Sequence, residues 1–322
     1  MNTQTKPIKT NIEYVLISCC TCKRPKMLSE ALNSIKKINF PENIKVEVLV
    51  CDNDATRSGE IAVKEFEQTS EIKIHYVVEE ERGIAPARNR VLKEAVNLNA
   101  SHVLFFDDDE VIEPNCLLEH IKLYETNANA YISSGPAFNT FTKNFPNYIK
   151  KNIVFNYSTT KKTGQERETC ATNNVFFPVS LVKDYDVYFS LEYKFMGGED
   201  GDFFKRAREK GFTIIWNNEA IIYEMVSEAR ANLPYVLKRN HYNGFSSGLL
   251  KLKEENFNKK RNVYILRNLI IALFYFCLAI PSILLGLTIF FNVISLGLKA
   301  KGKFDAVTQN RSLNFYQNIS GE

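Results

Sequence analysis

The stretch His102-Val-Leu-Phe-Phe-Asp-Asp-Asp-Glu110 decides the fold, because a run of apolar residues passes directly into four consecutive acids. Residues 102–106 are typical of a strand buried on both faces, and the acids mark its end. Strands of the same kind are expected at 14–18, 46–51 and 72–78, and helices at 25–37, 60–66, 84–98 and 114–124. This alternation of strand and helix predicts an α/β fold with a doubly wound, mostly parallel sheet.

The acidic loop lies where such a sheet binds its ligands, beyond the carboxyl ends of the strands. Asp107 and Asp109 are two residues apart and can reach one site. Four adjacent acids repel one another, and a hard divalent cation relieves that repulsion. Because Mg²⁺ or Mn²⁺ is held by one or two carboxylates together with phosphate oxygens, the loop predicts a site for either ion. A solvated acidic turn is the alternative.

A second acidic turn, Gly198-Glu-Asp-Gly-Asp202, precedes a helical segment. Exposed N–H groups at a helix start favour anions, so one acid can simply cap the helix. The functional interpretation is a carboxylate base presented on a rigid helix start.

Polar residues also follow the second and third expected strands. Arg82-Gly-Ile-Ala-Pro-Ala-Arg88-Asn89 places cations where they can face phosphate or the acidic loop, or form charge pairs on a surface helix. In Cys51-Asp-Asn-Asp54 the carboxylate of Asp52 can accept a hydrogen bond from a ribose hydroxyl or from the imide N–H of a nucleotide base. An Asx turn explains the same residues.

The charge of the chain is divided unevenly. The 322 residues carry a net charge of +4, but residues 238–303 hold eleven Lys or Arg against two acids, which leaves the rest net acidic. This distribution argues against nucleic-acid binding and favours a protein of the membrane surface.

Residues 268–298 contain no Asp, Glu, Lys, Arg or His and have cations on both flanks. A membrane-spanning helix needs roughly 20 apolar residues, so the segment is long enough. A re-entrant or tightly folded hairpin, a single span kinked at Pro281, and a buried pair of core helices are all compatible with it. The preceding segment, 235–252, is expected to be a helix that lies on the bilayer or packs on the catalytic domain.

Together these motifs resemble the inverting family 2 glycosyltransferases with a GT-A fold, over about residues 13–210. The resemblance rests on Thr21-Cys-Lys-Arg-Pro25, Val50-Cys-Asp-Asn-Asp54, the 82–89 segment, Asp107-Asp-Asp-Glu110 and Gly198-Glu-Asp200. Glu80-Glu-Arg-Gly-Ile-Ala85, taken with the acidic loop, is similar to bacterial glucosyltransferases of the succinoglycan and exopolysaccharide type. The chain departs from many relatives at Asn53-Asp54-Ala55, where they have Asp-Gly-Ser.

The resemblance implies a role for each matching residue. Asp200 is the catalytic base, with Glu199 beside it, and Asp109 and Asp107 bind the Mg²⁺ or Mn²⁺ cofactor. The residues implied in nucleotide-sugar binding are Thr21, Asp52, Asn53, Arg82, Arg88, Asn89, Asp107 and Asp108. Asn173 and Asn174 are implied in contacts with the donor or acceptor sugar.

The implied reaction is metal-dependent hexosyl transfer, with inversion, from a UDP-sugar to a hydroxyl of a glycan or polyprenyl-linked acceptor. It belongs to bacterial surface polysaccharide synthesis on the cytoplasmic face of the inner membrane, with other polysaccharide assembly proteins as partners. The expected organisation is a tail (1–11), a GT-A domain (12–235), basic and hydrophobic membrane-associated helices (236–304) and a polar tail (305–322).

Two other functions compete with this one. A haloacid-dehalogenase-type phosphatase would use Asp107 as its nucleophile, but its nucleophile strand usually comes first, whereas three strand units precede Asp107 here. A non-catalytic membrane scaffold of a polysaccharide assembly complex would need no acids at the expected positions.

Overall fold

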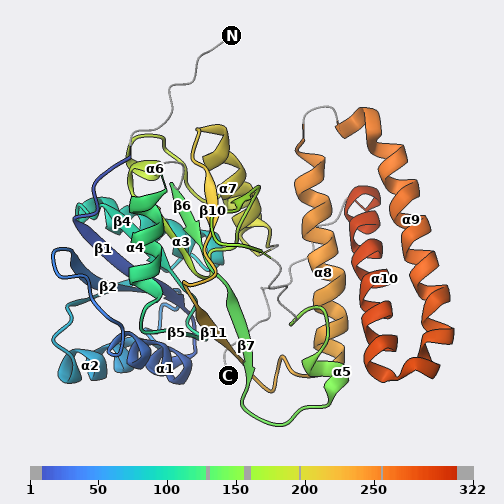
Figure 1. Ribbon diagram of the computed structural model, residues 1–322, viewed down its shortest axis with the longest axis horizontal. Helices are drawn as coiled ribbons and strands as arrows, with labels where there is room; N and C mark the ends of the chain where they lie inside the picture. The colour runs from blue at the N-terminus through green and yellow to red at the C-terminus, as the bar shows by residue number, and fades with distance from the viewer. Residues whose placement is uncertain (1–8, 128–130, 156–160, 196, 255–256, 310–322) are drawn as a thin grey trace.

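The computed structural model describes residues 9–127, 131–155, 161–195, 197–254 and 257–309, and most of the two expected tails lies outside these ranges. An eight-stranded sheet has the order β3-β2-β1-β4-β9-β6-β10-β8, and a smaller sheet has the order β5-β11-β7 (Figure 1). The large sheet comprises β1 (Tyr14–Thr21), β2 (Lys45–Asp52), β3 (Ile74–Val78), β4 (His102–Phe105), β6 (Ile132–Ser134), β8 (Glu166–Arg167), β9 (Val175–Pro178) and β10 (Ile214–Trp216). The small sheet comprises β5 (Glu110–Ile112), β7 (Ala137–Phe141) and β11 (Ile222–Val226).

Helices join the strands, and most of them cover the two faces of the large sheet. They are α1 (Pro25–Ile35), α2 (Glu60–Thr69), α3 (Ile84–Asn97), α4 (Cys116–Thr126), α5 (Asn147–Lys150), α6 (Ser180–Lys183) and α7 (Glu199–Glu209), with a short 3₁₀ turn η1 (Leu191–Tyr193). The four strands and four helices expected up to residue 126 are therefore confirmed, with ends that differ by a few residues. Strands β3, β2, β1 and β4 are mutually parallel, as predicted, whereas β9 runs antiparallel to both β4 and β6.

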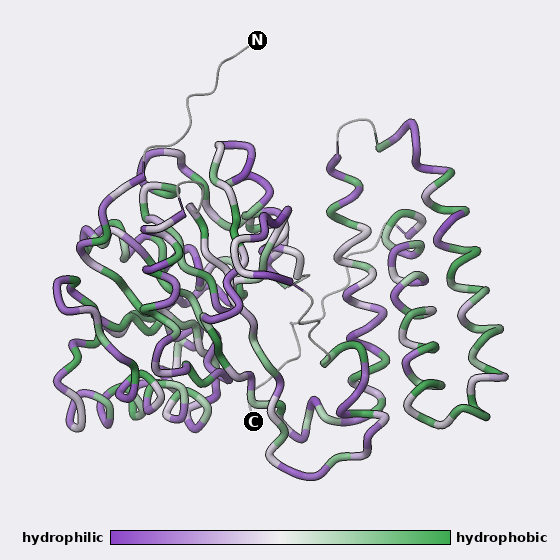
Figure 2. The backbone as a smooth tube through the Cα atoms, viewed as in Figure 1, coloured by the Kyte–Doolittle hydropathy of each residue, from purple (hydrophilic) through white to green (hydrophobic). Residues whose placement is uncertain are grey.

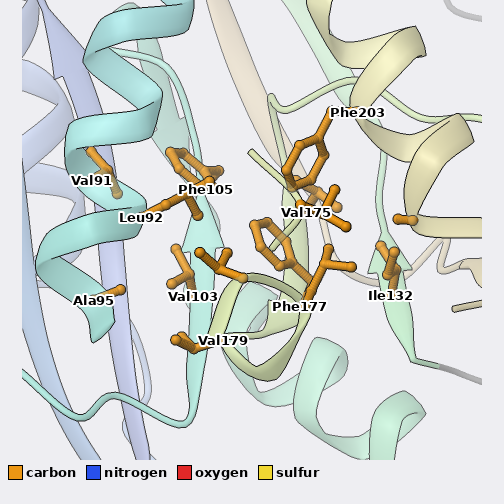
Figure 3. Packing of buried hydrophobic residues seen from close by; sticks show 14 of the residues in the cluster. Val91, Leu92, Ala95, Val103, Phe105, Ile132, Val175, Phe177, Val179 and Phe203 are labelled. Carbon is orange, nitrogen blue, oxygen red and sulfur yellow. The ribbon is translucent and has the colours of Figure 1, made fainter. Parts of the chain in front are cut away.

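The core forms because side chains alternate along the central strands. Leu16 points to one face of the sheet, while Val15 and Ile17 point to the other, and all three are fully buried. Figure 3 shows part of the first face, where Leu92 of α3 lies beside Phe105 of β4, and Phe177 of β9 lies toward Phe203 of α7. Burying an aromatic or aliphatic side chain stabilises the fold by roughly 1.5–3 kcal/mol, so this packing rigidly holds the strand ends that follow it.

Three long helices form a separate layer beside the sheets: α8 (Leu233–Leu252), α9 (Phe257–Ser282) and α10 (Leu287–Thr308) (Figure 1). A 3₁₀ turn, η2 (Ile283–Leu285), and Gly286 join α9 to α10. Gly286 has a φ of 104°, a conformation that favours glycine, and the chain reverses there. The segment therefore forms two helices joined by a turn, and not the single kinked helix that the sequence also allowed.

Helix α8 packs on α10 at very close range, with α10 lying between α8 and α9 (Figure 1). A Cβ atom on Gly244 would lie 2.0 Å from the carbonyl oxygen of Lys299, and one on Gly302 would lie 2.0 Å from that of His241. The two backbones can approach this far only because both positions are glycine. His241 Nε2 also lies 2.7 Å from Asp305 Oδ2, and this contact attaches the C-terminal end of α10 to α8.

Candidate active site

A cavity of about 400 Å³ opens at the carboxyl ends of the central strands and reaches the side of α8. Its walls come from the ends of β1 and β2, the loop before α3, the acidic loop after β4, the start of α7 and the first half of α8. Both acidic turns singled out from the sequence, Asp107–Asp109 and Glu199–Asp200, line this one cavity. Segments 90 residues apart in the chain are thus brought together, as predicted.

Arg88 is the residue that connects the two acidic turns. Its Nη1 lies 2.8 Å from Glu199 Oε1 and 2.7 Å from Asp200 Oδ1, and its Nη2 lies 3.6 Å from Asp107 Oδ1. Arg88 is buried, and it reaches the cavity because Gly83, with a φ of 138°, turns the chain into α3. An unpaired buried guanidinium is very unfavourable, so the three carboxylates stabilise Arg88 as much as it stabilises them.

Asp200 receives further hydrogen bonds from the strand side of the cavity. Thr172 Oγ1 donates to Asp200 Oδ1 at 3.0 Å, and the Thr172 N–H donates to Oδ2 at 3.3 Å. Asp200 stands in the first turn of α7, whose N-cap Gly198 has a φ of 95°. The carboxylate therefore has a fixed orientation at a helix N-terminus, where the helix dipole favours negative charge.

Two more arginines hold the other acids of the loop. Arg24 Nη1 lies 3.0 Å from Asp108 Oδ1, and Thr21 Oγ1 donates to Asp108 Oδ2 at 2.8 Å. Arg230 Nη1 lies 2.8 Å from Asp109 Oδ2 and 2.9 Å from Glu224 Oε1. The loop is thus braced by the end of β1 on one side and by the segment before α8 on the other.

Burial and mutual repulsion disfavour the charged forms of several of these acids. Desolvation, opposed by Arg24, raises the pKa of Asp108 to about 6, and desolvation together with Asp200 raises the pKa of Glu199 to about 7. Desolvation and then Asp109 raise the pKa of Glu224 to about 7. The pKa of Asp107 is raised by desolvation and by Asp109 and Asp200, against Arg88. Burial is thus the main reason that these acids ionise less readily than usual, and a cation bound among them would favour their charged forms.

This grouping of carboxylates at one cavity fits a divalent cation. Within the described residues no three His, Cys, Asp or Glu side chains are grouped as a ready-made metal cage. Mg²⁺ and Mn²⁺ sites that share a substrate phosphate need only one or two carboxylates. Asp107 and Asp109 both line the cavity and could supply them. The side chain of Asp107 is 41% exposed and so remains accessible from the cavity.

Comparison with known proteins decides the family. The model of glycosyl transferase family 2 matches residues 14–186, and that of glycosyl transferase family group 2 matches residues 102–301. The chain is a family 2 glycosyltransferase. It is 30% identical, over 237 residues, to the succinoglycan biosynthesis protein ExoM of Rhizobium meliloti (strain 1021), covering 74% of this chain and 75% of ExoM. This assignment leaves the phosphatase and scaffold alternatives without support.

Two solved structures share the fold. The mannosyltransferase PcManGT from Pyrobaculum calidifontis, in complex with GDP-Man and Mn²⁺, superposes with a TM-score of 0.64 at 14% identity, covering 94% of this chain and 89% of that one. Residues 1–349 of S. aureus TarS, in complex with UDP, give a TM-score of 0.53 at 18% identity, covering 91% of each chain. The expected GT-A fold of this glycosyltransferase is therefore confirmed.

Most of the residues predicted to form the site of the glycosyltransferase line the cavity. They are Thr21, Asn53, Arg82, Arg88, Asp107, Asp108, Asp109, Asn173, Glu199 and Asp200. Asn53 also shapes the wall, because its amide donates to the carbonyl oxygens of Glu79 and Glu81 and accepts from the N–H of Gly83. Asn173 donates to Glu110 Oε1 at 3.1 Å, behind the acidic loop.

Three predicted residues lie away from the cavity surface. Asp52 is fully buried and accepts hydrogen bonds from the Gly59 N–H and the Tyr76 hydroxyl, both at 2.7 Å. Asn89 exchanges two hydrogen bonds with the backbone of Phe189. Asn174 is also fully buried, and its amide donates to the carbonyl oxygens of Pro136 and Ala220. Their polar groups hold the loops that carry the cavity residues.

Sequence reasoning missed the α8 side of the cavity. Arg230, Glu224, Tyr235, Arg239 and Asn243 all line it, and so do Val154 and Phe155 from the loop after α5. None of these residues belongs to a local motif. Arg24 was visible within the Thr21–Pro25 motif, but no role had been attached to it.

Proposed function

We propose that this family 2 glycosyltransferase is an inverting, divalent-cation-dependent hexosyltransferase that uses a UDP-sugar. The observation that carries the proposal is the contact of Arg88 with both Asp107 and Asp200, since it supports a proposed metal ligand and a proposed base acting in one cavity. The UDP complex of TarS and the GDP-Man and Mn²⁺ complex of PcManGT support a nucleotide-sugar donor and a divalent cation.

Asp200 is the proposed catalytic base. It takes the proton of the acceptor hydroxyl as that oxygen bonds to the anomeric carbon and as the bond from that carbon to the diphosphate breaks. Attack from the face opposite the leaving group inverts the anomeric centre, and the nucleoside diphosphate departs with the bonding electrons. Thr172 and Arg88 orient the carboxylate for this step, which general-base catalysis speeds by roughly two to four orders of magnitude.

The acidic loop is the proposed site of the cation, with Asp109 and Asp107 as its protein ligands. Bound there, Mg²⁺ or Mn²⁺ would offset the negative charge that develops on the leaving diphosphate. Arg82, which lines the same cavity, adds positive charge on the side of α3. Glu199 pairs with Arg88 beside the base and is proposed to orient the acceptor.

The proposed acceptor is a hydroxyl of a glycan or of a polyprenyl-linked oligosaccharide, in the synthesis of a bacterial surface polysaccharide. The similarity to ExoM, which is named for succinoglycan biosynthesis, supports this class. One helix of the described residues, Phe257–Leu285, is long and apolar enough to cross a membrane by length and composition alone. We further propose that the protein lies on the cytoplasmic face of the inner membrane and that polysaccharide assembly proteins are its partners. The proposed GT-A domain covers residues 12–235.

The experiment that tests this function is a donor panel. The full-length protein is incubated with UDP-, GDP- and dTDP-hexoses and Mn²⁺, and release of the nucleoside diphosphate is measured with and without a chelator. Cation-dependent turnover of a UDP-hexose is expected. Turnover that a chelator leaves unchanged would refute the metal assignment, and absence of nucleotide binding across the whole panel would refute the function.

A further inference from the structure

An apolar face runs along the outside of the helical hairpin. Six apolar residues lie along this face at spacings of one, three, four or six residues, and each is more than half exposed: Leu266, Ile270, Leu273, Phe274, Ile280 and Leu284. We call these residues the α9 outer face, and it continues into the turn η2. Figure 2 shows the hydrophobic colour prevailing along α9 and at the hairpin turn, with hydrophilic residues at the start of α9. Exposed apolar surface of this extent marks a site of interaction.

Cations border this face at one end only. Because α9 and α10 are antiparallel, Lys259, Lys260 and Arg261 at the start of α9 lie at the same end of the hairpin as Lys301 and Lys303 near the end of α10. From Asn268 through the turn to Leu298 there is no charge. Apolar side chains with clustered cations beside them complement a bilayer that contains anionic headgroups.

The middle of α10 is fastened to the catalytic part of the molecule. Asn292 Oδ1 accepts from the Ile153 N–H at 2.9 Å, and Asn292 Nδ2 donates to the Lys151 carbonyl oxygen at 3.1 Å. One turn further along, Ser295 Oγ accepts from Asn152 at 3.0 Å. These contacts hold α10 beside the loop that supplies a wall of the cavity.

This attachment is incompatible with a hairpin that crosses the bilayer. Such a hairpin would carry residues 151–153, including the exposed side chain of Lys151, into the hydrocarbon, where an unpaired charge is strongly disfavoured. The uncharged part of α10, Leu287–Leu298, is also well short of the roughly 20 residues that a span needs. An orientation in the plane of the membrane avoids both problems.

We propose that the α9 outer face and η2 form an in-plane, monotopic binding face for an anionic lipid bilayer, and that neither α9 nor α10 crosses it. The proposal rests on the membrane attachment proposed above and is independent of the transfer reaction. In this orientation α10 and α8 lie between the bilayer-facing helix α9 and the cavity of the candidate active site. Tyr235 and Arg239 of α8 line that cavity. A lipid-linked acceptor would then reach the cavity from the same leaflet that binds α9.

The first test is flotation of the full-length protein with vesicles of phosphatidylcholine alone or with phosphatidylglycerol. The double variant F274E/L284E changes two exposed residues of the face, and I61E is the matched control because Ile61 is 69% exposed on α2. We expect wild type and I61E to float with the anionic vesicles and the double variant to lose at least tenfold in bound fraction. Equal flotation of all three proteins would overturn the proposal, as would a dimer in solution that only F274E/L284E disrupts, because a second copy would then cover the face.

The second test separates an in-plane helix from a span. Trp is placed at Phe274 or at Leu284, and quenching by lipids brominated at different acyl depths is measured, with Ile61→Trp as the control. An in-plane α9 predicts the same shallow depth at both positions, whereas a crossing hairpin predicts clearly different depths and overturns the proposal. Release of nucleoside diphosphate is measured on every variant, so that a failure of the proposed function is distinguished from a failure of the membrane face.

Discussion

Arg88 Nη1 lies 2.7 Å from Asp200 Oδ1, and this contact joins the helix that follows β3 to the helix that carries the proposed base. The same guanidinium contacts Asp107 in the acidic loop. Arg88 is buried, so its position is set by the packing of α3 on the sheet and not by solvent. One buried side chain therefore contacts both the proposed base and the acidic loop.

Asp200→Asn is expected to slow transfer severely while cation-dependent UDP binding survives. The amide preserves the shape of the side chain but cannot accept the acceptor proton, so we expect a loss of about 10²–10⁴ in rate. Transfer is followed by nucleotide release, and binding by calorimetry. Asp202→Asn on the same helix is the control, because Asp202 pairs with Arg206 and does not line the cavity. Wild-type turnover in Asp200→Asn would refute the assignment of the base.

Arg88→Met is expected to destabilise the fold, because it leaves Glu199, Asp200 and Asp107 without their shared cation. Breaking a buried ion pair costs about 3–5 kcal/mol, and we expect the lower end because Asp107 and Asp200 are partly exposed. Urea unfolding measures the change. Adding Glu199→Gln should recover part of the loss, since it removes one of the uncompensated charges. A single variant as stable as wild type would contradict the bridging role of Arg88.

Removal of divalent cations with a chelator is expected to stop transfer, and Mn²⁺ should restore it. Asp109→Asn should raise the half-saturating Mn²⁺ concentration by at least about tenfold, since even outer partners of a metal contribute that much. Nucleotide release as a function of Mn²⁺ concentration gives the value. Asp184→Asn is the control, because Asp184 is exposed and lies outside the cavity. It should leave the half-saturating Mn²⁺ concentration unchanged. Identical curves for Asp109→Asn and wild type would remove Asp109 from the metal site.

The stability of the protein is expected to fall as pH rises from about 5.5 to 8, in part through Glu199. Its folded-state pKa of about 7 lies above the ordinary value of about 4.3, so the folded chain holds a proton that the unfolded chain has lost. This contribution is complete below the unfolded-state pKa and is lost as pH rises through 7. The groups that face Glu199 are Arg88 and Asp200, and both remain in Glu199→Gln. The decrease in Tm over this range should therefore be smaller in Glu199→Gln than in wild type. Equal decreases would contradict the raised pKa of Glu199.

Asn152→Ala is expected to disturb the cavity wall without touching the proposed donor site. The amide of Asn152 contacts Asn240 and Ser295, all three side chains are buried, and Val154 two residues on lines the cavity. Leaving buried polar partners unsatisfied costs about 1–3 kcal/mol. We expect a higher KM for the acceptor and an unchanged Kd for UDP. A change confined to UDP binding would show that the part of the cavity wall near Val154 belongs to the donor site and not to the acceptor site.

The sequence by itself determined the parallel half of the sheet and the residues at its carboxyl edge. Strands such as 14–18 and 102–106 are short apolar runs, and the polar residues that end them follow directly in the chain, so both signals are local. For the same reason Asp107, Asp109 and Asp200 could be named from motifs of a few residues. The roles of Asp52, Asn89 and Asn174 could not be judged in this way, because a polar side chain that holds a loop and one that faces a ligand have the same local sequence.

Only the tertiary structure decided what lies opposite the acidic loop and how the hydrophobic segment is arranged. Arg230, Arg239 and Phe155 reach the cavity through contacts between segments far apart in the chain, which leave no periodic signal. The choice between a span and a hairpin depended on Gly286 and on the bonds from Asn292 and Ser295 to residues 151–153. Hydropathy reports how apolar a helix is, whereas the position of that helix is set by the surfaces it packs against.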